Sequence, residues 1–94
     1  MDKTKVIFRM WENGQVIAMF PEVAVDKIGY YCQSYMNVGQ HSPASPSLVA
    51  NTKPASKEDY AELMKELVKI GYDNLQVIKK FSYAMQKIRM AMYN

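Results

Sequence analysis

The sequence predicts an α+β fold in which an antiparallel sheet of three or four strands carries two helices packed on one face. Three features lead to this prediction. Two alternating apolar segments flank an Asn-Gly pair near the N-terminus, and capped helical patterns begin at Ser56 and at Ser82. The predicted order is strand, strand, strand, loop, helix, strand, helix, within a single domain that spans residues 1–94.

The first two strands are predicted as a hairpin over residues 6–20. Asn13 and Gly14 tolerate positive φ at both central positions, as a two-residue type I′ turn requires, and this turn places Arg9 opposite Ala18. One face then carries Val6, Phe8, Met10, Ile17 and Met19. The other face carries Ile7, Arg9, Trp11, Val16, Ala18 and Phe20. A slip by one residue would bury Arg9, so the pattern favours this register.

A third strand is predicted over residues 30–38, with Cys32, Met36 and Val38 facing the core. Residues 39–56 contain three prolines and are predicted as a long irregular loop. Within this loop, the apolar residues 48–50 form either a short strand or an anchor that pins the loop to the domain.

The clearest helix begins after Ser56, which forms a capping-box pattern with Asp59, and ends at Gly71. Its apolar face consists of Tyr60, Leu63, Met64, Leu67 and Ile70. Residues 75–81 fit a strand or a helix, and a fourth strand is preferred because the segment lies between two capped helices. The last helix spans residues 82–93. Its apolar stripe consists of Phe81, Ala84, Met85, Ile88, Ala91 and Met92.

Composition indicates an ordinary globular domain, because 49% of the 94 residues are hydrophobic and 22% are charged. No apolar run is long enough for a signal sequence or a membrane span, so we expect an intracellular, cytoplasmic protein without a membrane partner. The net charge is +3. Residues 74–94 carry four basic residues and no acidic ones, so the basic character belongs to the C-terminal segment.

The sequence gives little support to catalysis or to cofactor binding. Cys32 and His41 are the only candidates for a nucleophile and a base. We expect Cys32 to be a buried core thiol and His41 a solvated loop residue, because free cysteines are among the most buried residues. One Cys and one His provide no metal-ligand spacing, and no glycine-rich phosphate loop is present. We therefore expect a non-enzymatic protein with no cofactor, no metal and no small-molecule substrate.

The preferred hypothesis is a protein–protein interaction or regulatory module, either homodimeric or bound to another protein. Two short helices cover one face of such a sheet, so the aromatic face is left for a partner. Aromatic residues and Arg are enriched at the centres of interfaces. The candidate protein-binding residues are Arg9, Trp11, Phe20, Tyr31, Tyr35, Gln40 and His41. Scattered surface aromatics are the alternative interpretation, because isolated ones are normal.

Nucleic-acid binding through the basic C-terminal segment is the second hypothesis. Basic side chains hold a phosphate backbone, and aromatic side chains stack on bases. The candidate residues are Lys79, Lys80, Tyr83, Lys87 and Arg89. The alternative is a solvated helix face in which Arg89 complements the helix dipole.

The chain also resembles a family of small uncharacterised proteins encoded by gut bacteria and their mobile elements or phages. Residues 6–22 (VIFRMWENGQVIAMFPE), 29–42 (GYYCQSYMNVGQHS), 52–56 (TKPAS) and 71–82 (GYDNLQVIKKFS) carry this resemblance. It implies a compact single domain in a bacterial cytoplasm. It assigns no activity, cofactor or functional residue.

Overall fold

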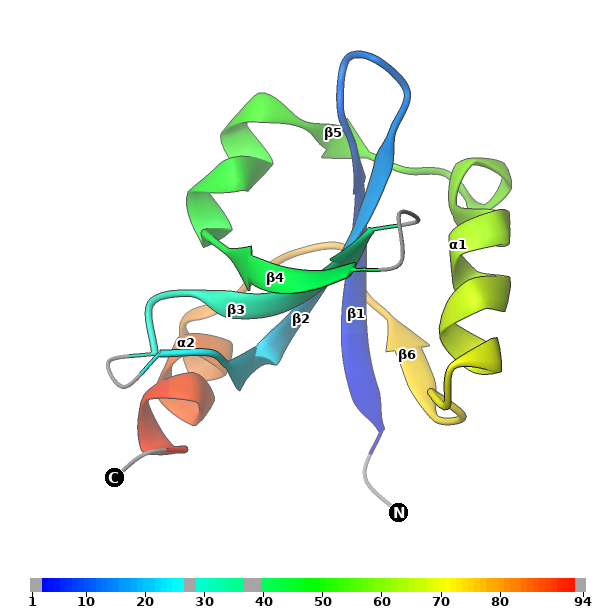
Figure 1. Ribbon diagram of the computed structural model, residues 1–94. Helices are drawn as coiled ribbons and strands as arrows, with labels where there is room; N and C mark the ends of the chain where they lie inside the picture. The colour runs from blue at the N-terminus through cyan, green and yellow to red at the C-terminus, as the bar shows by residue number, and fades with distance from the viewer. Residues whose placement is uncertain (1–2, 27–28, 37–39, 93–94) are drawn as a thin grey trace.

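The computed structural model describes residues 3–26, 29–36 and 40–92. Within these residues, a six-stranded sheet runs in the order β4-β3-β2-β1-β5, and β6 also pairs with β1 (Figure 1). The strands are β1 (Thr4–Met10), β2 (Val16–Ala24), β3 (Cys32–Met36), β4 (Gln40–Ala44), β5 (Lys53–Pro54) and β6 (Leu75–Val77). A 3-10 helix, η1 (Pro46–Asn51), and two α-helices, α1 (Lys57–Lys69) and α2 (Tyr83–Ala91), complete the fold. The predicted α+β class is confirmed.

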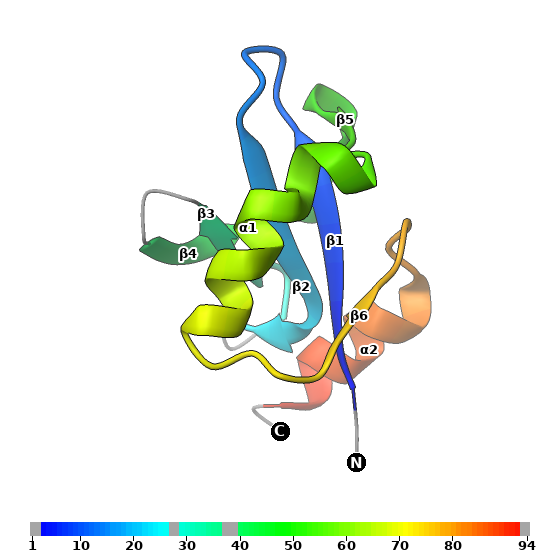
Figure 2. The ribbon, with the colours of Figure 1, turned by 90° about the vertical axis from the view of Figure 1, so that its right-hand side faces the viewer.

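Both faces of the sheet are covered. The first apolar cluster consists of Val6, Phe8, Val16, Ala18, Phe20, Tyr35, Leu63 and Leu67, and α1 supplies the last two residues. The second consists of Ile7, Ile17, Met19, Cys32 and Ala44, and Leu48 of η1 packs on it together with Phe81. Rather than sharing one face, the helices divide between the two sides, with α1 in front of the sheet and α2 behind it in Figure 2. The expectation of an uncovered aromatic face is therefore wrong.

The hairpin register differs from the predicted one by one residue. Trp11 pairs with Gln15 through a 2.8 Å hydrogen bond from the Trp11 amide, so the loop has three residues. Gly14 takes a φ of 88°, whereas Asn13 does not take positive φ, and a type I′ turn is thereby excluded. Arg9 consequently pairs with Ile17 on the second face. Arg9 is buried in this register, although the other register was predicted in order to keep Arg9 out of the core.

The segment predicted as an irregular loop over residues 39–56 is largely ordered. Its described part forms β4, η1 and β5. Ser45 caps η1, and Leu48 packs on the second apolar cluster, so residues 48–50 act as the anchor that was one of the two expected forms. Strand β3 begins at Cys32, two residues later than predicted, and Val38, expected in the core, lies outside the described residues.

The helix predicted after Ser56 is confirmed together with its caps. Ser56 and Asp59 form a reciprocal capping box. At the other end, the amide of Gly71 donates to Val68 and that of Tyr72 donates to Leu67, which is the Schellman pattern.

The strand expected after this helix is also confirmed, but it is shorter than predicted. It ends at Val77 and pairs in parallel with β1. The last helix begins after its predicted cap, Ser82, whose hydroxyl accepts a hydrogen bond from the Met85 amide.

Candidate interaction surfaces

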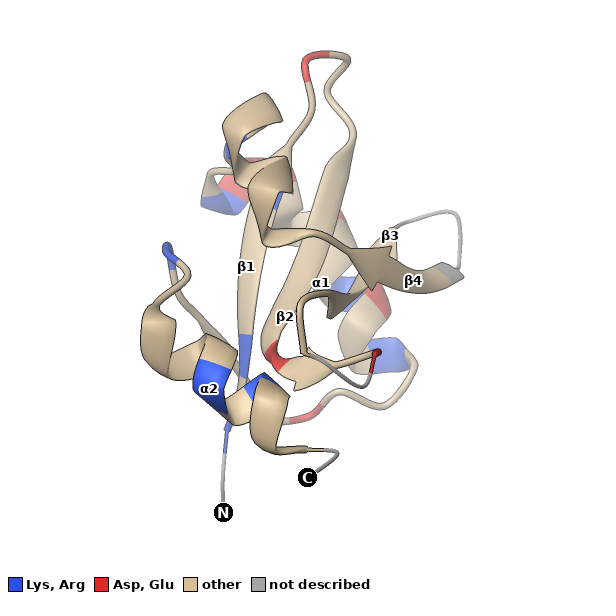
Figure 3. Cartoon of the chain, turned by 90° about the vertical axis from the view of Figure 1, so that its left-hand side faces the viewer, with Lys and Arg blue, Asp and Glu red and all other residues tan. Residues whose placement is uncertain are grey.

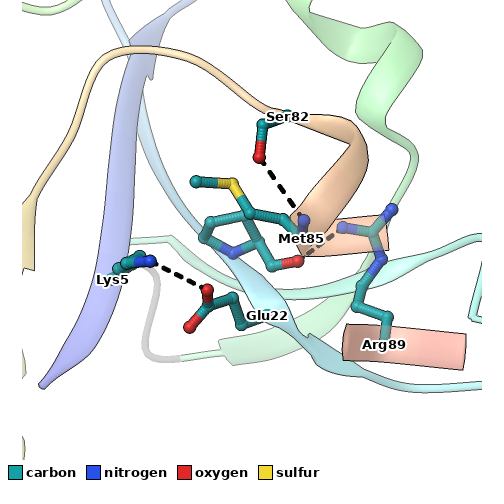
Figure 4. A network of polar contacts seen from close by, with 6 residues as sticks. Lys5, Glu22, Ser82, Met85 and Arg89 are labelled. Atoms are coloured by element: carbon teal, nitrogen blue, oxygen red, sulfur yellow. Dashed lines mark hydrogen bonds and ion pairs between the residues drawn. The ribbon is translucent and has the colours of Figure 1, made fainter. Parts of the chain in front are cut away.

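Helix α2 docks on the sheet through one polar and one apolar side chain. Met85 and Arg89 lie four residues apart and are its buried residues, with Arg89 only 3% exposed. Nε of Arg89 donates to the Gly29 carbonyl at 2.9 Å. Its Nη1 donates to the Pro21 carbonyl, and this second bond is the dashed line from Arg89 in Figure 4. These bonds give two of the N–H donors of the buried guanidinium neutral oxygen partners and fix the rotation of α2 about its axis.

Gly29 allows α2 to approach this closely. A Cβ atom at position 29 would lie 2.7 Å from the Met90 backbone nitrogen and 2.9 Å from the Arg89 carbonyl carbon. The φ of Gly29 is +75°, a region that residues with a side chain rarely adopt. The position therefore requires glycine for two separate reasons.

This docking turns most of the predicted apolar stripe of α2 toward solvent. Of that stripe, Met85 is buried and Phe81 is half-buried, whereas Ala84, Ile88, Ala91 and Met92 are exposed. We define the outer face of α2 as Tyr83, Ala84, Lys87, Ile88 and Ala91, all of them exposed. Ile88 is 44% exposed. The expected burial of the stripe is wrong because the hydrogen bonds of Arg89 bring the opposite edge of the helix to the sheet.

Three of the residues predicted to bind protein lie in the interior. Arg9 is 8% exposed and donates to the carbonyls of Val49 and Thr52 and to the Thr52 hydroxyl. Phe20 is buried and stacks on Tyr72 with ring centroids 4.9 Å apart. Tyr35 is buried in the cluster beneath α1. These three side chains hold the domain together and are not available to a partner.

The other predicted residues are spread over the surface. Trp11 is half-buried and lines a cavity of about 600 Å³ beside Met36. Tyr31 is exposed and meets Tyr30 edge to face. His41 is exposed, with its Nε2 2.9 Å from the Tyr72 hydroxyl. The side chain of Gln40 lies outside the described part of the structure.

No family model, curated protein or solved structure matches this chain. The resemblance to small proteins of gut bacteria and their mobile elements therefore stays a prediction.

The residues predicted to bind nucleic acid fall into two groups. Lys79, Lys80, Tyr83 and Lys87 are exposed, and the Lys87 ammonium lies 5.0 Å from the centre of the Tyr83 ring. Arg89 is buried and donates hydrogen bonds to backbone carbonyls. It is therefore neither a solvated residue of the helix face nor free to contact a phosphate group. Tyr30 and Phe81 line the same hollow as Tyr83, but neither was among the residues predicted to bind nucleic acid. Phe81 follows Lys80 directly in the chain, whereas Tyr30 is distant in sequence and reaches this group only through the fold.

The two candidate catalytic residues, Cys32 and His41, lie apart from one another. Cys32 is fully buried in the second apolar cluster, as predicted, and burial raises the pKa of its thiol to about 11. His41 pairs with Tyr35, whose side chain belongs to the opposite face of the sheet. Within residues 3–26, 29–36 and 40–92, no three metal-ligating side chains cluster. In the same ranges, no helix is long and apolar enough to cross a membrane.

Proposed function

We propose that this chain is a non-enzymatic interaction module that binds another protein through the outer face of α2. The observation that carries the proposal is the outward position of its apolar side chains, with Tyr83 70% exposed and Ile88 44% exposed. Contiguous exposed apolar surface rimmed by polar groups is typical of interaction sites. The small residues Ala84 and Ala91 allow another backbone to come close on either side of Lys87.

The charge of this face favours a partner that carries carboxylates. Helix α2 contains Lys87 and the buried Arg89 and no acidic residue. An antiparallel pairing of two copies would centre on Lys87, the midpoint of Tyr83–Ala91, and would bring two ammonium groups together. A helix of nine residues is only about 13 Å long and offers a second copy far less than the roughly 800 Å² that each partner of a stable complex buries. A partner whose apolar groove surrounds the helix and carries acidic residues at its rim would pair with Lys87 and would also bury more surface than a second copy of the helix can.

The test compares two charge insertions at exposed apolar positions. Ile88→Asp places a carboxylate on the outer face of α2, and Val68→Asp places one on α1, where Val68 is 56% exposed. Quantitative affinity purification from cells that express the protein should recover a partner with the wild type. Ile88→Asp should recover at least ~10-fold less of this partner than the wild type does, and Val68→Asp should recover the same amount. In calorimetry with the purified partner, Ile88→Asp should likewise bind more weakly than the wild type and Val68→Asp.

Two results would contradict this proposal. The first is equal retention of the purified partner by Ile88→Asp and Val68→Asp, which would place the contact elsewhere on the molecule. The second is a stable dimer of the isolated chain in light scattering that Ile88→Asp dissociates, because it would show that a second copy occupies this face. The thermal unfolding of both variants, followed by circular dichroism, serves as the folding control.

A further inference from the structure

A groove lies between η1 and the segment that leads into α2. Two hollows of about 540 Å³ and 340 Å³ form it, and Pro46 and Phe81 line both of them. Lys79 and Lys80 line the larger hollow. In Figure 3, η1, α2 and the blue turn before α2 lie on the side facing the viewer. We name these two hollows together the basic groove.

A buried arginine lines each hollow of the basic groove. Arg9 lines the larger hollow and Arg89 the smaller one. Both guanidinium groups donate to neutral oxygens, and neither forms an ion pair with a carboxylate in the part of the chain that the structure describes. Buried charges in proteins are normally paired with an opposite charge. Two uncompensated cations below the groove, with the two lysines at its edge, therefore make it a place of positive potential.

The smaller hollow also offers flat aromatic surfaces. Tyr83 is 70% exposed there, and Tyr30 lies on the same hollow. The Ser45 hydroxyl donates to the Tyr30 hydroxyl at 3.1 Å and holds this ring in place. Exposed tyrosines beside cations are the combination on which nucleobases stack. No Asp or Glu among the described residues lines either hollow.

We propose that the basic groove binds a nucleotide, with its phosphate beside Lys79 and Lys80 and its base against Tyr83. A bare inorganic anion would leave the apolar walls at Val49, Pro54 and Phe81 without a partner. An acidic peptide would satisfy the cations but would not use the tyrosine rings. The same chemistry is found in a free mononucleotide and in a single-stranded nucleic acid, and the experiment separates these two sources.

The experiment measures binding to the full chain at low salt. Adenosine monophosphate and inorganic phosphate are titrated by NMR, with the amide signals of residues 79–83 as the readout. A fluorescein-labelled single-stranded DNA of ten nucleotides, the matching duplex and a ten-residue polyglutamate are compared by anisotropy and competition. We expect saturable binding of the single strand at least ~10-fold tighter than that of the duplex, because the bases of a duplex are not free to stack. Binding of the mononucleotide but not of the strand would identify a free nucleotide as the ligand.

Matched variants locate the site. The double variant Lys79→Glu/Lys80→Glu should weaken binding by at least ~10-fold and should lower the slope of log affinity against log salt by about 1.4, or about 0.7 for each lost phosphate contact. Lys57→Glu/Lys65→Glu on α1 makes the same change in net charge at exposed positions and should leave binding unchanged. Tyr83→Leu should lose the contribution of stacking, and Tyr83→Phe should restore it.

Several outcomes would overturn the proposal. These are the absence of saturable binding by either nucleotide probe, equal losses in the two double-lysine variants, and competition by polyglutamate as strong as that by DNA. Equal binding of duplex and single strand would exclude stacking on Tyr83. Because Ile88 lines neither hollow, Ile88→Asp should leave nucleotide binding intact, and the failure of one proposal can be told from the failure of the other.

Discussion

Replacing Gly29 with alanine should undock α2 from the sheet. An alanine at a φ of +75° costs about 1–2 kcal/mol for its left-handed conformation. Its Cβ atom would lie 2.7–2.9 Å from three backbone atoms of Arg89 and Met90, so α2 must move away. This movement breaks the bond from Arg89 to the carbonyl of residue 29, and a bond of a charged donor contributes about 1.5–3 kcal/mol. The free energy of unfolding should therefore fall by about 2.5–5 kcal/mol.

Gly14 provides the matched control for this substitution. Its φ is +88°, but nothing lies within 4 Å of a Cβ atom built there, so Gly14→Ala should cost only the conformational ~1–2 kcal/mol. Urea unfolding followed by circular dichroism measures both variants. In thermal melts, Gly29→Ala should lower the midpoint by at least about 10 °C, given 4–8 °C per kcal/mol for a domain of this size. Equal destabilisation by the two substitutions would refute the close approach of Gly29 to α2.

Two further predictions concern titratable groups. Burial raises the pKa of Cys32 from 9.0 to about 11. Iodoacetamide at pH 8 should therefore label the thiol of the native protein at least ~100-fold more slowly than the thiol of the protein unfolded in urea. Equal labelling rates would contradict the burial of Cys32. The Ser56 amide and hydroxyl hold the pKa of Asp59 below its ordinary 3.8, so the carboxylate stabilises the fold above that pH and loses this effect as the pH falls through its lowered pKa. The stability difference between the wild type and Asp59→Asn, measured by urea unfolding, should thus be present at pH 6 and shrink toward pH 3, and a difference independent of pH would contradict the capping role.

Local signals in the sequence were sufficient to predict several elements. The capping box at Ser56, the Schellman end at Gly71 and the cap at Ser82 depend on residues within one or two helical turns, and all are observed. The hairpin was located correctly, but its loop length was not. Asn-Gly fits a two-residue turn as well as the last two positions of a three-residue loop, and both faces of the hairpin are apolar enough to be buried in either register.

The errors arise where a side chain finds partners far away in the sequence. Burial of Arg9 was rejected because its acceptors, the carbonyls of Val49 and Thr52, lie in a segment that was expected to be irregular. Arg89 was expected at the surface because its acceptors lie some sixty residues earlier in the chain, at Gly29 and Pro21. Backbone carbonyls carry no signal in the sequence, so neither docking contact could be predicted from residue types.

The rotation of α2 about its axis is the central claim, because the outer face and the smaller hollow of the basic groove both depend on it. Single cysteines at positions 85 and 88 test this claim directly with a thiol reagent, and the buried native thiol at Cys32 contributes little background. We predict that Ile88→Cys reacts within about tenfold of the rate of a free thiol, whereas Met85→Cys reacts at least ~100-fold more slowly. A Met85→Cys variant that stays folded and reacts as fast as Ile88→Cys would contradict the account.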